Sequence, residues 1–451
     1  MASLLMRNAD MLVTMDDARR EIPGGWLRAE DGAITAVGAP GAPGERAPAD
    51  EIVEARGCVV TPGLVNTHHH LFQSLVRAVP GGQDALLFGW LKSLYPIFAR
   101  MRPEDIQAAV TLGLAELALS GCTCAADHQY IFPNGARLDH SIEAAARVGI
   151  RFHATRGAMS IGESLGGLPP DFLTEAEPAI LGDMERVVDA FHDPAPGAMV
   201  RIALAPCSPF TVSTGLMRDA AVLAREKGVM LHTHLAENDE DVEYSLAHYG
   251  CRPGQYAEEL GWTGEDVWHA HCVKLDAGEI DLFARTGTGV AHCPSSNCRL
   301  GSGIAPLRAL VDARVKVGLG VDGSASNDAA HLLLEARQAM LLQRVSQGAD
   351  AFTAREALEV ATRGGAAVLG RADLGSLAPG KRADFALWDM GGLPAAGLWD
   401  PVAGLVLSGP FTPKALYVEG RAVVQEGRLV TASEPLIAET VARSVARLAG
   451  G

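Results

Sequence analysis

Apolar runs rich in β-branched residues alternate along the chain with amphipathic stretches rich in alanine and leucine. The runs have the length of buried strands and cover residues 59–64, 121–126, 150–154, 200–205, 229–234, 267–271, 289–292 and 315–321. The amphipathic stretches have helical spacing and cover residues 103–120, 138–148, 177–192, 214–227, 239–249, 277–286, 306–313 and 329–346. Eight such units predict an α/β fold in which a parallel sheet closes into a (β/α)8 TIM barrel. The alternative is a doubly wound open sheet, which usually carries a glycine-rich phosphate turn that is missing after the first run.

The two ends of the chain have a different pattern of short segments separated by turn residues. These segments cover residues 4–7, 10–15, 26–30 and 33–38 at one end, and 385–388, 414–418 and 421–425 at the other. Glu419-Gly420 between the last two is a hairpin signal. Because neither end has enough strands to bury a core alone, we expect the ends to pair into one small β-sandwich. The predicted domains are the sandwich, residues 1–60 plus 372–451 with a final helix at 435–448, and the barrel, residues 61–371.

The composition narrows the class of protein. Hydrophobic residues make up 48% of the 451, which excludes disorder, and the net charge is −16. A chain this acidic has no overall field that attracts nucleic acid or an anionic membrane, so we expect neither as a partner. No apolar run reaches the roughly 20 residues of a transmembrane helix, and the N-terminal stretch becomes acidic too soon for a secretory signal. Eight cysteines without the short paired spacing of a zinc ribbon, with only Cys122 and Cys124 close together as in one strand, indicate reduced thiols, so a cytoplasmic enzyme is expected.

Histidine and aspartate gather where the predicted barrel strands end, which is where barrels of this kind place their active sites. The first run is followed by His68, His69 and His70, and alternation along a strand points the first and third into the barrel mouth. The fifth, sixth and eighth runs end at His234, His271 and Asp322. His232 and His269 precede their partners by two residues, so we expect them to face the same side deeper in the barrel.

A single divalent ion needs three or four protein ligands and an open position for water. We predict His68, His70, His234 and Asp322 as these ligands, a nitrogen and oxygen set that suits zinc or ferrous iron better than magnesium. Such an ion lowers the pKa of bound water towards about 7 and gives hydroxide at neutral pH. A two-metal site would require a bridging lysine or glutamate at the fourth strand, which ends at Pro206-Cys207 instead.

These residues together resemble the amidohydrolase superfamily, and most of all its mononuclear cytosine/guanine/S-adenosylhomocysteine deaminase branch. The resemblance rests on the four ligands with His271 and Glu237, and on the phrases at 62–63, 322–327 and 377–384. It implies hydrolytic removal of an amino group from an aromatic heterocycle. It also implies that Glu237 passes protons between water, ring nitrogen and leaving ammonia, that His271 holds the water or the developing oxygen, and that Asp322 accepts the water proton.

Three residues are candidate substrate contacts. Gln73 lies three residues after His70, the spacing at which guanine-deaminating members of the branch place an amide that reads the purine edge. Trp90 is expected to cover the ring by stacking, and Arg156 to bind an exocyclic carbonyl. The glycine-rich stretch 157–170 is typical of a loop over the mouth of a barrel.

The stretches 66–73, 126–128 and 155–160 are similar to those of 8-oxoguanine deaminases, which convert 8-oxoguanine to uric acid and ammonia. Isoxanthopterin and guanine deaminases and triazine ethylaminohydrolases share much of this pattern and stay open as alternatives. A hydrolase of amides or carbamates and a scaffold that has lost its ligands are two further hypotheses. The resemblance also implies a small heterocyclic substrate and a homo-oligomer.

Overall fold

The computed structural model describes residues 3–450, and its centre is a closed barrel of eight parallel strands. Around the barrel the strand order is β10-β11-β12-β13-β14-β15-β8-β9. In chain order their bounds are β8 Leu64–Asn66, β9 Cys122–Gln129, β10 Arg151–Ala158, β11 Val200–Pro206, β12 Met230–Leu235, β13 Val267–His271, β14 Gly289–His292 and β15 Lys316–Leu319. The predicted (β/α)8 barrel is confirmed, and the doubly wound sheet is wrong.

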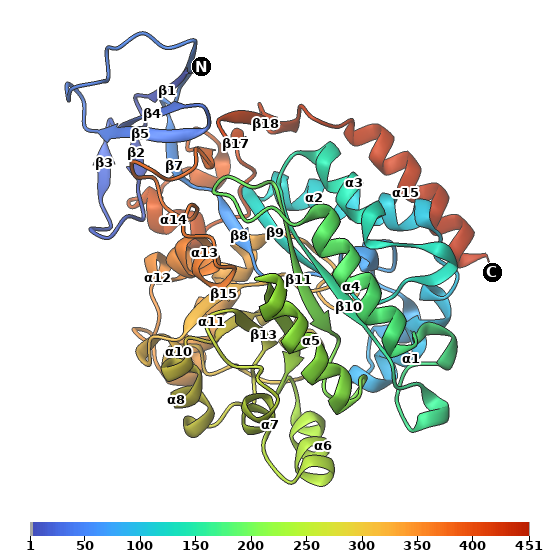
Figure 1. Ribbon diagram of the computed structural model, residues 1–451. Coiled ribbons are helices and arrows are strands. Elements are labelled where there is room, and N and C mark those ends of the chain that lie inside the picture. The colour runs from blue at the N-terminus through green and yellow to red at the C-terminus, as the bar shows by residue number, and fades with distance from the viewer. Residues whose placement is uncertain (1–2, 451) are drawn as a thin grey trace.

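Helices follow the strands and surround the barrel (Figure 1). They are α1 Leu87–Phe98, α2 Pro103–Leu119, α3 Leu138–Val148, α4 Glu177–Phe191, α5 Thr214–Lys227, α6 Asp239–Tyr249, α7 Pro253–Glu259, α8 Ala277–Thr286, α9 Pro294–Arg299, α10 Leu307–Asp312 and α11 Leu332–Gln347. Local chemistry sets their ends. At α5, the Ser213 hydroxyl accepts the N–H of Leu216 at 3.0 Å, and Gly228 ends the helix with a left-handed φ of 67°.

The first predicted strand, residues 59–64, is divided in the structure. Its first part belongs to β7 (Cys58–Pro62) in an outer sheet, and only β8 lies in the barrel. Between them, a Cβ atom at Gly63 would lie 2.1 Å from Oγ1 of Thr123. Glycine is therefore required where the chain passes from the outer sheet into the barrel, and the split is invisible to hydrophobic periodicity because every residue of both strands is buried.

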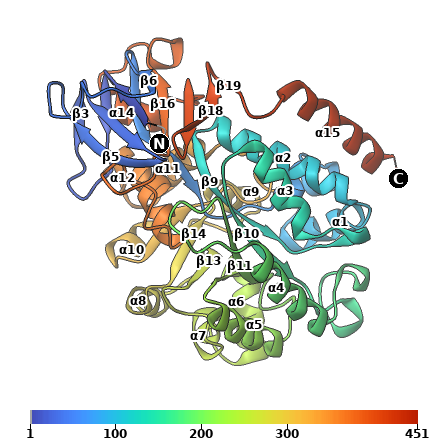
Figure 2. The same cartoon turned by 45° about the horizontal axis from the view of Figure 1, so that its top comes forward.

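Both ends of the chain contribute strands to the same outer sheet, as predicted (Figure 2). Its order is β19-β18-β17-β16-β7-β2-β3, and a second sheet has the order β5-β4-β1-β6. The strands are β1 Ser3–Arg7, β2 Met11–Val13, β3 Glu21–Pro23, β4 Trp26–Glu30, β5 Ala33–Gly38, β6 Glu51–Glu54, β16 Phe385–Asp389, β17 Ala415–Val418, β18 Arg421–Gln425 and β19 Arg428–Leu429. The division into domains at residues 60 and 372 stays a prediction, and residues 1, 2 and 451 of those ranges lie outside the described part.

The remaining helices connect the barrel to the outer sheets or cover the outside of the barrel. They are α12 Ala354–Glu359, α13 Gly365–Val368, α14 Pro401–Leu407 and α15 Glu434–Ala449. The last of them runs along α2, where Arg447 donates to Asp105 and to the carbonyl of Arg100 (Figure 1). Within residues 3–450, no helix is long and apolar enough to cross a membrane.

Candidate metal centre and active site

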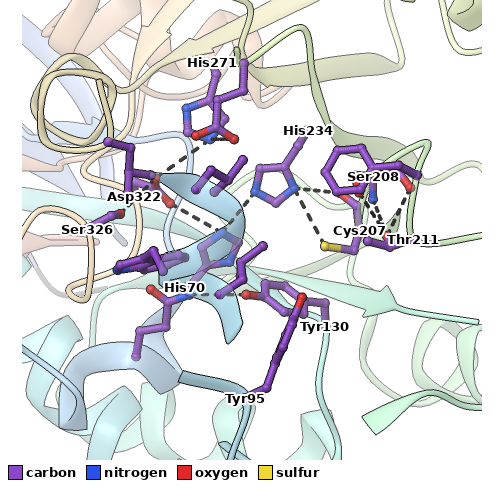
Figure 3. Close-up of a pocket in the computed structure, with 17 residues that line it drawn as sticks. His70, Tyr95, Tyr130, Cys207, Ser208, Thr211, His234, His271, Asp322 and Ser326 are labelled. Carbon is purple, nitrogen blue, oxygen red and sulfur yellow. Dashed lines mark hydrogen bonds and ion pairs between the residues drawn. The ribbon is translucent and has the colours of Figure 1, made fainter. Parts of the chain in front are cut away.

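A cavity opens at the carboxyl ends of the barrel strands, and three of the four predicted ligands, His70, His234 and Asp322, line it (Figure 3). Nε2 of His68 and Nε2 of His70 lie 3.3 and 3.4 Å from Oδ1 of Asp322. Nε2 of His70 lies 3.1 Å from Nε2 of His234. The segments after β8 and β15 and the end of β12 therefore bring three imidazoles and one carboxylate close together, with His70 next to both His234 and Asp322.

Hydrogen bonds on the far side of each ring fix which nitrogen faces that point. Nδ1 of His70 donates to the carbonyl of His128 at 2.7 Å, and Nδ1 of His234 donates to the carbonyl of Cys207 at 2.6 Å. His232 donates from Nδ1 to the carbonyl of Trp268, so its Nε2 accepts from Nδ1 of His68 at 2.8 Å. All three ligand rings therefore carry hydrogen on Nδ1 and direct the lone pair of Nε2 inwards.

The protonation states also suit a cation. Burial lowers the pKa of His68, His70 and His234, the last to about 3, so the rings are neutral and able to coordinate. Burial alone would raise the pKa of Asp322, but the adjacent imidazole of His68 and the neighbouring His271 and His70 hold it well below its usual value. In the described part of the chain, Nε2 of His68 has no hydrogen-bond partner. A buried lone pair of this kind, among neutral imidazoles and an ionised carboxylate, fits a divalent cation.

His271 enters the site through a backbone turn, not through strand alternation. Trp268 faces the barrel interior, where it stacks on His232, and His269 faces outwards, where Nε2 bonds the carbonyl of Trp262. His271 would follow His269 outwards, but its φ of 71° swings the ring back into the cavity. The prediction that His269 shares the side of His271 is therefore wrong. Left-handed residues with a Cβ atom are strained, and they concentrate at functional sites.

Glu237 stands above the ligands, after another left-handed residue, Ala236, with a φ of 51°. Its Oε2 lies 3.7 Å from Nε2 of His271, and its Oε1 has no partner within residues 3–450. The pKa of Glu237 is raised to about 7. Burial is the largest cause; the nearby His271 opposes this shift, and the negative charge of Asp241 adds to it. A carboxyl group with this pKa takes up and releases a proton near neutral pH, which general acid–base work requires.

His271 is held as a donor toward the cavity. Its Nδ1 is 2.9 Å from Oδ1 of Asn297, and its Nε2 lies 3.7 Å from Glu237 and 3.8 Å from Asp322. Burial lowers the pKa of His271, but the two carboxylates and the Asn297 bond outweigh burial and raise it. The ring therefore directs Nε2 between the carboxyl groups of Glu237 and Asp322.

The comparisons with known proteins agree with this geometry. Residues 59–423 match the model of the Amidohydrolase family. The chain belongs to this family.

It is 47% identical to an 8-oxoguanine deaminase from Pseudomonas aeruginosa over 89% of this chain and 90% of that one. It is 40% identical to an isoxanthopterin deaminase from an unknown prokaryotic organism, over 94% of this chain and 92% of that one. An atrazine chlorohydrolase from Arthrobacter aurescens TC1, solved with zinc, superposes with a TM-score of 0.93 at 34% identity, covering 98% and 100% of the two chains.

The predicted family is confirmed, and this amidohydrolase is a metal-dependent aminohydrolase, with a site that takes a divalent metal. This result argues against the scaffold hypothesis, and none of the four side chains predicted as ligands is displaced from the site. The end of β11 holds Cys207, whose Sγ lies 4.0 Å from Nδ1 of His234, at the place where a bridging lysine would stand in a two-metal site.

Two of the three predicted substrate contacts line the cavity of the amidohydrolase. Gln73 lies in the short 3₁₀ helix Leu71–Leu75 that follows His70, and Trp90 lies in α1. Trp90 is fixed by a hydrogen bond from Nε1 to the carbonyl of Ala325 at 3.1 Å.

Arg156 does not face the cavity, contrary to the prediction. Its Nε donates to Asp183 at 2.7 Å, its Nη2 donates to Glu175 at 2.9 Å, and its guanidinium lies 3.8 Å over the ring of Phe132. Alternation along β10 places this side chain on the outer surface of the barrel, where it meets α4 and the segment before it. Arg156 therefore contributes to the structure around the barrel and not to substrate binding.

The wall above the ligands comes from α1, which the sequence did not single out. Leu87, Trp90, Leu91 and Tyr95 lie at helical spacing on one face of α1 and line the cavity. The predicted loop 157–170 contributes no described lining residue. Tyr130, directly after β9, and Ser326 are further lining residues that the sequence reasoning missed. Ser326 and Ser296 both donate to Oδ2 of Asp322, at 3.2 and 2.6 Å.

Proposed function

We propose that this amidohydrolase converts 8-oxoguanine and water to uric acid and ammonia, with zinc held by His68, His70, His234 and Asp322. The substrate is supported by the relative that is 47% identical and named an 8-oxoguanine deaminase. Zinc is supported by the neutral imidazoles of the site and by the zinc in the related atrazine chlorohydrolase. The observation that carries the chemistry is Glu237, a buried carboxyl group with a pKa near 7 and one free oxygen above the ligands.

A bound divalent ion in this site lowers the pKa of water towards about 7 and so supplies the nucleophile. The chain's own residues hold and move the protons. The water oxygen attacks C2 of the heterocycle, and the proton that it loses passes to Asp322 or Glu237. Ser296 and Ser326 hold Oδ2 of Asp322 in place for this exchange.

Glu237 then gives this proton to the ring nitrogen next to C2. The second water proton, now on the hydroxyl at the tetrahedral C2, passes through Asp322 or Glu237 to the amino nitrogen. The C2–N bond breaks, its electron pair leaves with nitrogen as ammonia, and a carbonyl forms at C2. One water is consumed for each ammonia released, and Glu237 ends in its starting state. His271 donates its N–H to the oxygen on which negative charge develops at C2. His271, Glu237 and Asp322 are all buried, so this charge is shielded from bulk water.

The walls bind the flat ring. Trp90 and Leu91 of α1 offer apolar contact, and the amide of Gln73 offers hydrogen bonds at the edge of the ring. The predicted homo-oligomer, the predicted absence of a nucleic-acid partner and the predicted cytoplasmic location stay predictions.

An assay of ammonia release tests the proposal, with purines, pterins, triazines and simple amides as substrates at equal concentration. We expect the largest kcat/KM with 8-oxoguanine. A larger value with isoxanthopterin, guanine or an aminotriazine would move the substrate to that class but leave the deaminase chemistry standing. Hydrolysis of amides or carbamates without ammonia release from any heterocycle would overturn both.

A further inference from the structure

One hydroxyl group in the cavity has no partner within the protein. The described residues that line the cavity and carry a hydroxyl group are Tyr95, Tyr130, Ser208, Thr211 and Ser326. Four of these hydroxyls are bonded, Tyr130 to Gln73 at 3.3 Å, Ser208 to Thr211 at 3.0 Å, and Ser326 to Asp322 at 3.2 Å. The hydroxyl of Tyr95 makes no hydrogen bond anywhere in residues 3–450. It is therefore the hydroxyl that is left for a ligand.

The hydroxyl of Tyr95 is open to the cavity. Oε1 of Gln73 also lacks a partner, but protein atoms enclose it fully, whereas the oxygen of Tyr95 is not enclosed in this way. Figure 3 shows the ring of Tyr95 with its oxygen end turned into the cavity. Burial of the ring raises the pKa of Tyr95 above its usual value, so the phenol is neutral and keeps a proton to donate.

Tyr95 lies farther from the metal ligands than Tyr130 does. The ring of Tyr130 packs on the ligand His70, with the ring centroids 5.0 Å apart. The ring of Tyr95 packs on Phe98 at 6.3 Å and, within residues 3–450, on no ligand imidazole. Its neighbours on the same face of α1, such as Leu91, are apolar. Tyr95 therefore offers a hydrogen bond in an apolar wall, to a part of the substrate that lies away from the reacting carbon.

A purine that reacts at C2 has its five-membered ring at the other end of the molecule. In 8-oxoguanine this ring carries a carbonyl oxygen at C8, which loses its hydrogen bonds to water when it enters an apolar wall. We propose that the hydroxyl of Tyr95 donates to this oxygen, and that it thereby makes the enzyme prefer a bicyclic substrate with a carbonyl group on the second ring. This inference rests on the proposed function, and it adds the contact that distinguishes 8-oxoguanine from guanine and from single-ring heterocycles.

Tyr95→Phe tests the proposal, because it removes the hydroxyl and keeps the ring. The readout is kcat/KM for 8-oxoguanine, for guanine, which has no oxygen at C8, and for isocytosine, which has the reacting edge of guanine but no second ring. We expect the value for 8-oxoguanine to fall by about 10-fold, the effect of one hydrogen bond, and the other two to stay within about twofold. Tyr417→Phe is the matched control, a buried tyrosine of the outer sheet whose hydroxyl donates to Glu51 at 3.3 Å, and it should change none of the three.

Equal losses for 8-oxoguanine and guanine, or no loss for 8-oxoguanine, would overturn the proposal. Binding of the reaction products makes the same comparison without turnover. In titration calorimetry, Tyr95→Phe should bind uric acid about 10-fold more weakly than the wild type and should bind xanthine, which has no oxygen at C8, equally well. The thermal midpoint should not fall, because the hydroxyl has no bond within the protein. A lower midpoint would assign the hydroxyl to the stability of the fold and would contradict the proposal.

The proposed function and this inference can fail separately. If 8-oxoguanine is the best substrate of the wild type and Tyr95→Phe keeps the wild-type ratio of kcat/KM for 8-oxoguanine to that for guanine, only this inference fails. If the wild type prefers another heterocycle, the proposed substrate is wrong, and calorimetry alone decides on Tyr95. An affinity for uric acid that is the same in both enzymes, or absent from both, would then contradict the inference.

Discussion

Two groups of buried polar side chains, the Arg151 ion-pair cluster at the amino end of the barrel and the cavity residues at its carboxyl end, differ in how they are hydrogen-bonded. At the amino end, Arg151 at the start of β10 makes two hydrogen bonds to Asp384, at 2.7 and 2.8 Å, and a further one to Glu419. Asp384 also accepts the N–H of Glu419 at 2.8 Å. At the carboxyl end, His68, Gln73 and Glu237 each keep a buried nitrogen or oxygen that finds no partner anywhere in residues 3–450.

The difference separates structural burial from functional burial. A buried charge is tolerated when it is paired and hydrogen-bonded, and the Arg151 cluster meets that condition while it ties the barrel to the strands built from the chain ends. Unpaired buried atoms cost free energy, and those of His68 and Glu237 lie at or beside the cavity, where a bound metal or substrate can complete them. The comparison therefore assigns catalysis to one end of the barrel and stability to the other, and substitutions at the two ends should have separable effects.

The largest effect is expected for Glu237→Gln. Glutamine keeps the size and polarity of the side chain but cannot carry a proton, so kcat should fall by about 10³-fold or more while the metal stays bound. Steady-state kinetics with metal analysis measures both. Glu243→Gln, an exposed position on the following helix, is the matched control and should leave kcat unchanged. Full activity in Glu237→Gln would refute the proton-transfer role.

Substitution of Arg151 at the amino end of the barrel should lower the stability of the fold and leave catalysis almost unchanged. Arg151→Ala leaves Asp384 buried and unpaired, so the free energy of unfolding should fall by about 3–5 kcal/mol, while kcat/KM at low temperature stays within twofold. Urea unfolding followed by fluorescence measures the change. Arg443→Ala, which removes an exposed pair with Glu439, should cost less than about 1 kcal/mol. A loss in Arg151→Ala no larger than in this control, or a loss of kcat/KM in the folded enzyme, would remove the distinction between the two ends.

A smaller effect is expected for Asp241→Asn. Asp241 accepts the N–H of Glu237 at 2.8 Å, and its negative charge raises the pKa of Glu237. Asparagine keeps an acceptor but removes the charge, so the pKa of Glu237 falls and its carboxylate stays ionised at lower pH. The acid limb of the kcat/KM profile should therefore move to lower pH, by roughly half a unit. Asp239→Asn, at an exposed and solvent-screened position, should leave the profile in place, and a shift to higher pH in Asp241→Asn would contradict the coupling.

The smallest effect is expected for Trp90→Phe. Phenylalanine keeps an aromatic wall but loses the N–H that anchors Trp90 to Ala325. KM should rise by about 3- to 5-fold with kcat nearly constant, because one net hydrogen bond is lost outside the reacting atoms. Initial-rate kinetics over a range of substrate concentrations separates the two. A fall in kcat with an unchanged KM would place Trp90 in the chemistry and not in the wall.

The fold and the proximity of the four candidate ligands could be predicted from the sequence because both depend on repeating patterns. Strand length, helical spacing and the position of histidines after the strands follow from periods that the chain shows openly. The division at Gly63 was not within reach, since β7 and β8 are both fully buried and only the contact with Thr123 separates them. The errors at Arg156 and His269 have a common cause, because the sequence does not reveal which face of a strand is the inside, nor that a left-handed φ at His271 reverses the alternation.

The sequence analysis did not identify the residues of the cavity wall, for a different reason. The apolar face of α1 looks the same whether it packs on a core or lines a cavity, and nothing in the sequence around Tyr130 shows that its hydroxyl accepts from Gln73 at the cavity wall. Such roles depend on contacts between residues far apart in the chain.

The most direct test of the single-metal site is the metal content of the purified enzyme and of variants in single ligands, measured by inductively coupled plasma mass spectrometry. We expect about one divalent transition metal per chain in the wild type, far less in His234→Ala and Asp322→Ala, and an unchanged amount in His271→Ala. An enzyme without a transition metal, one with two ions per chain, or a His234→Ala variant that keeps its metal would contradict the convergence of His68, His70, His234 and Asp322 on a single cation.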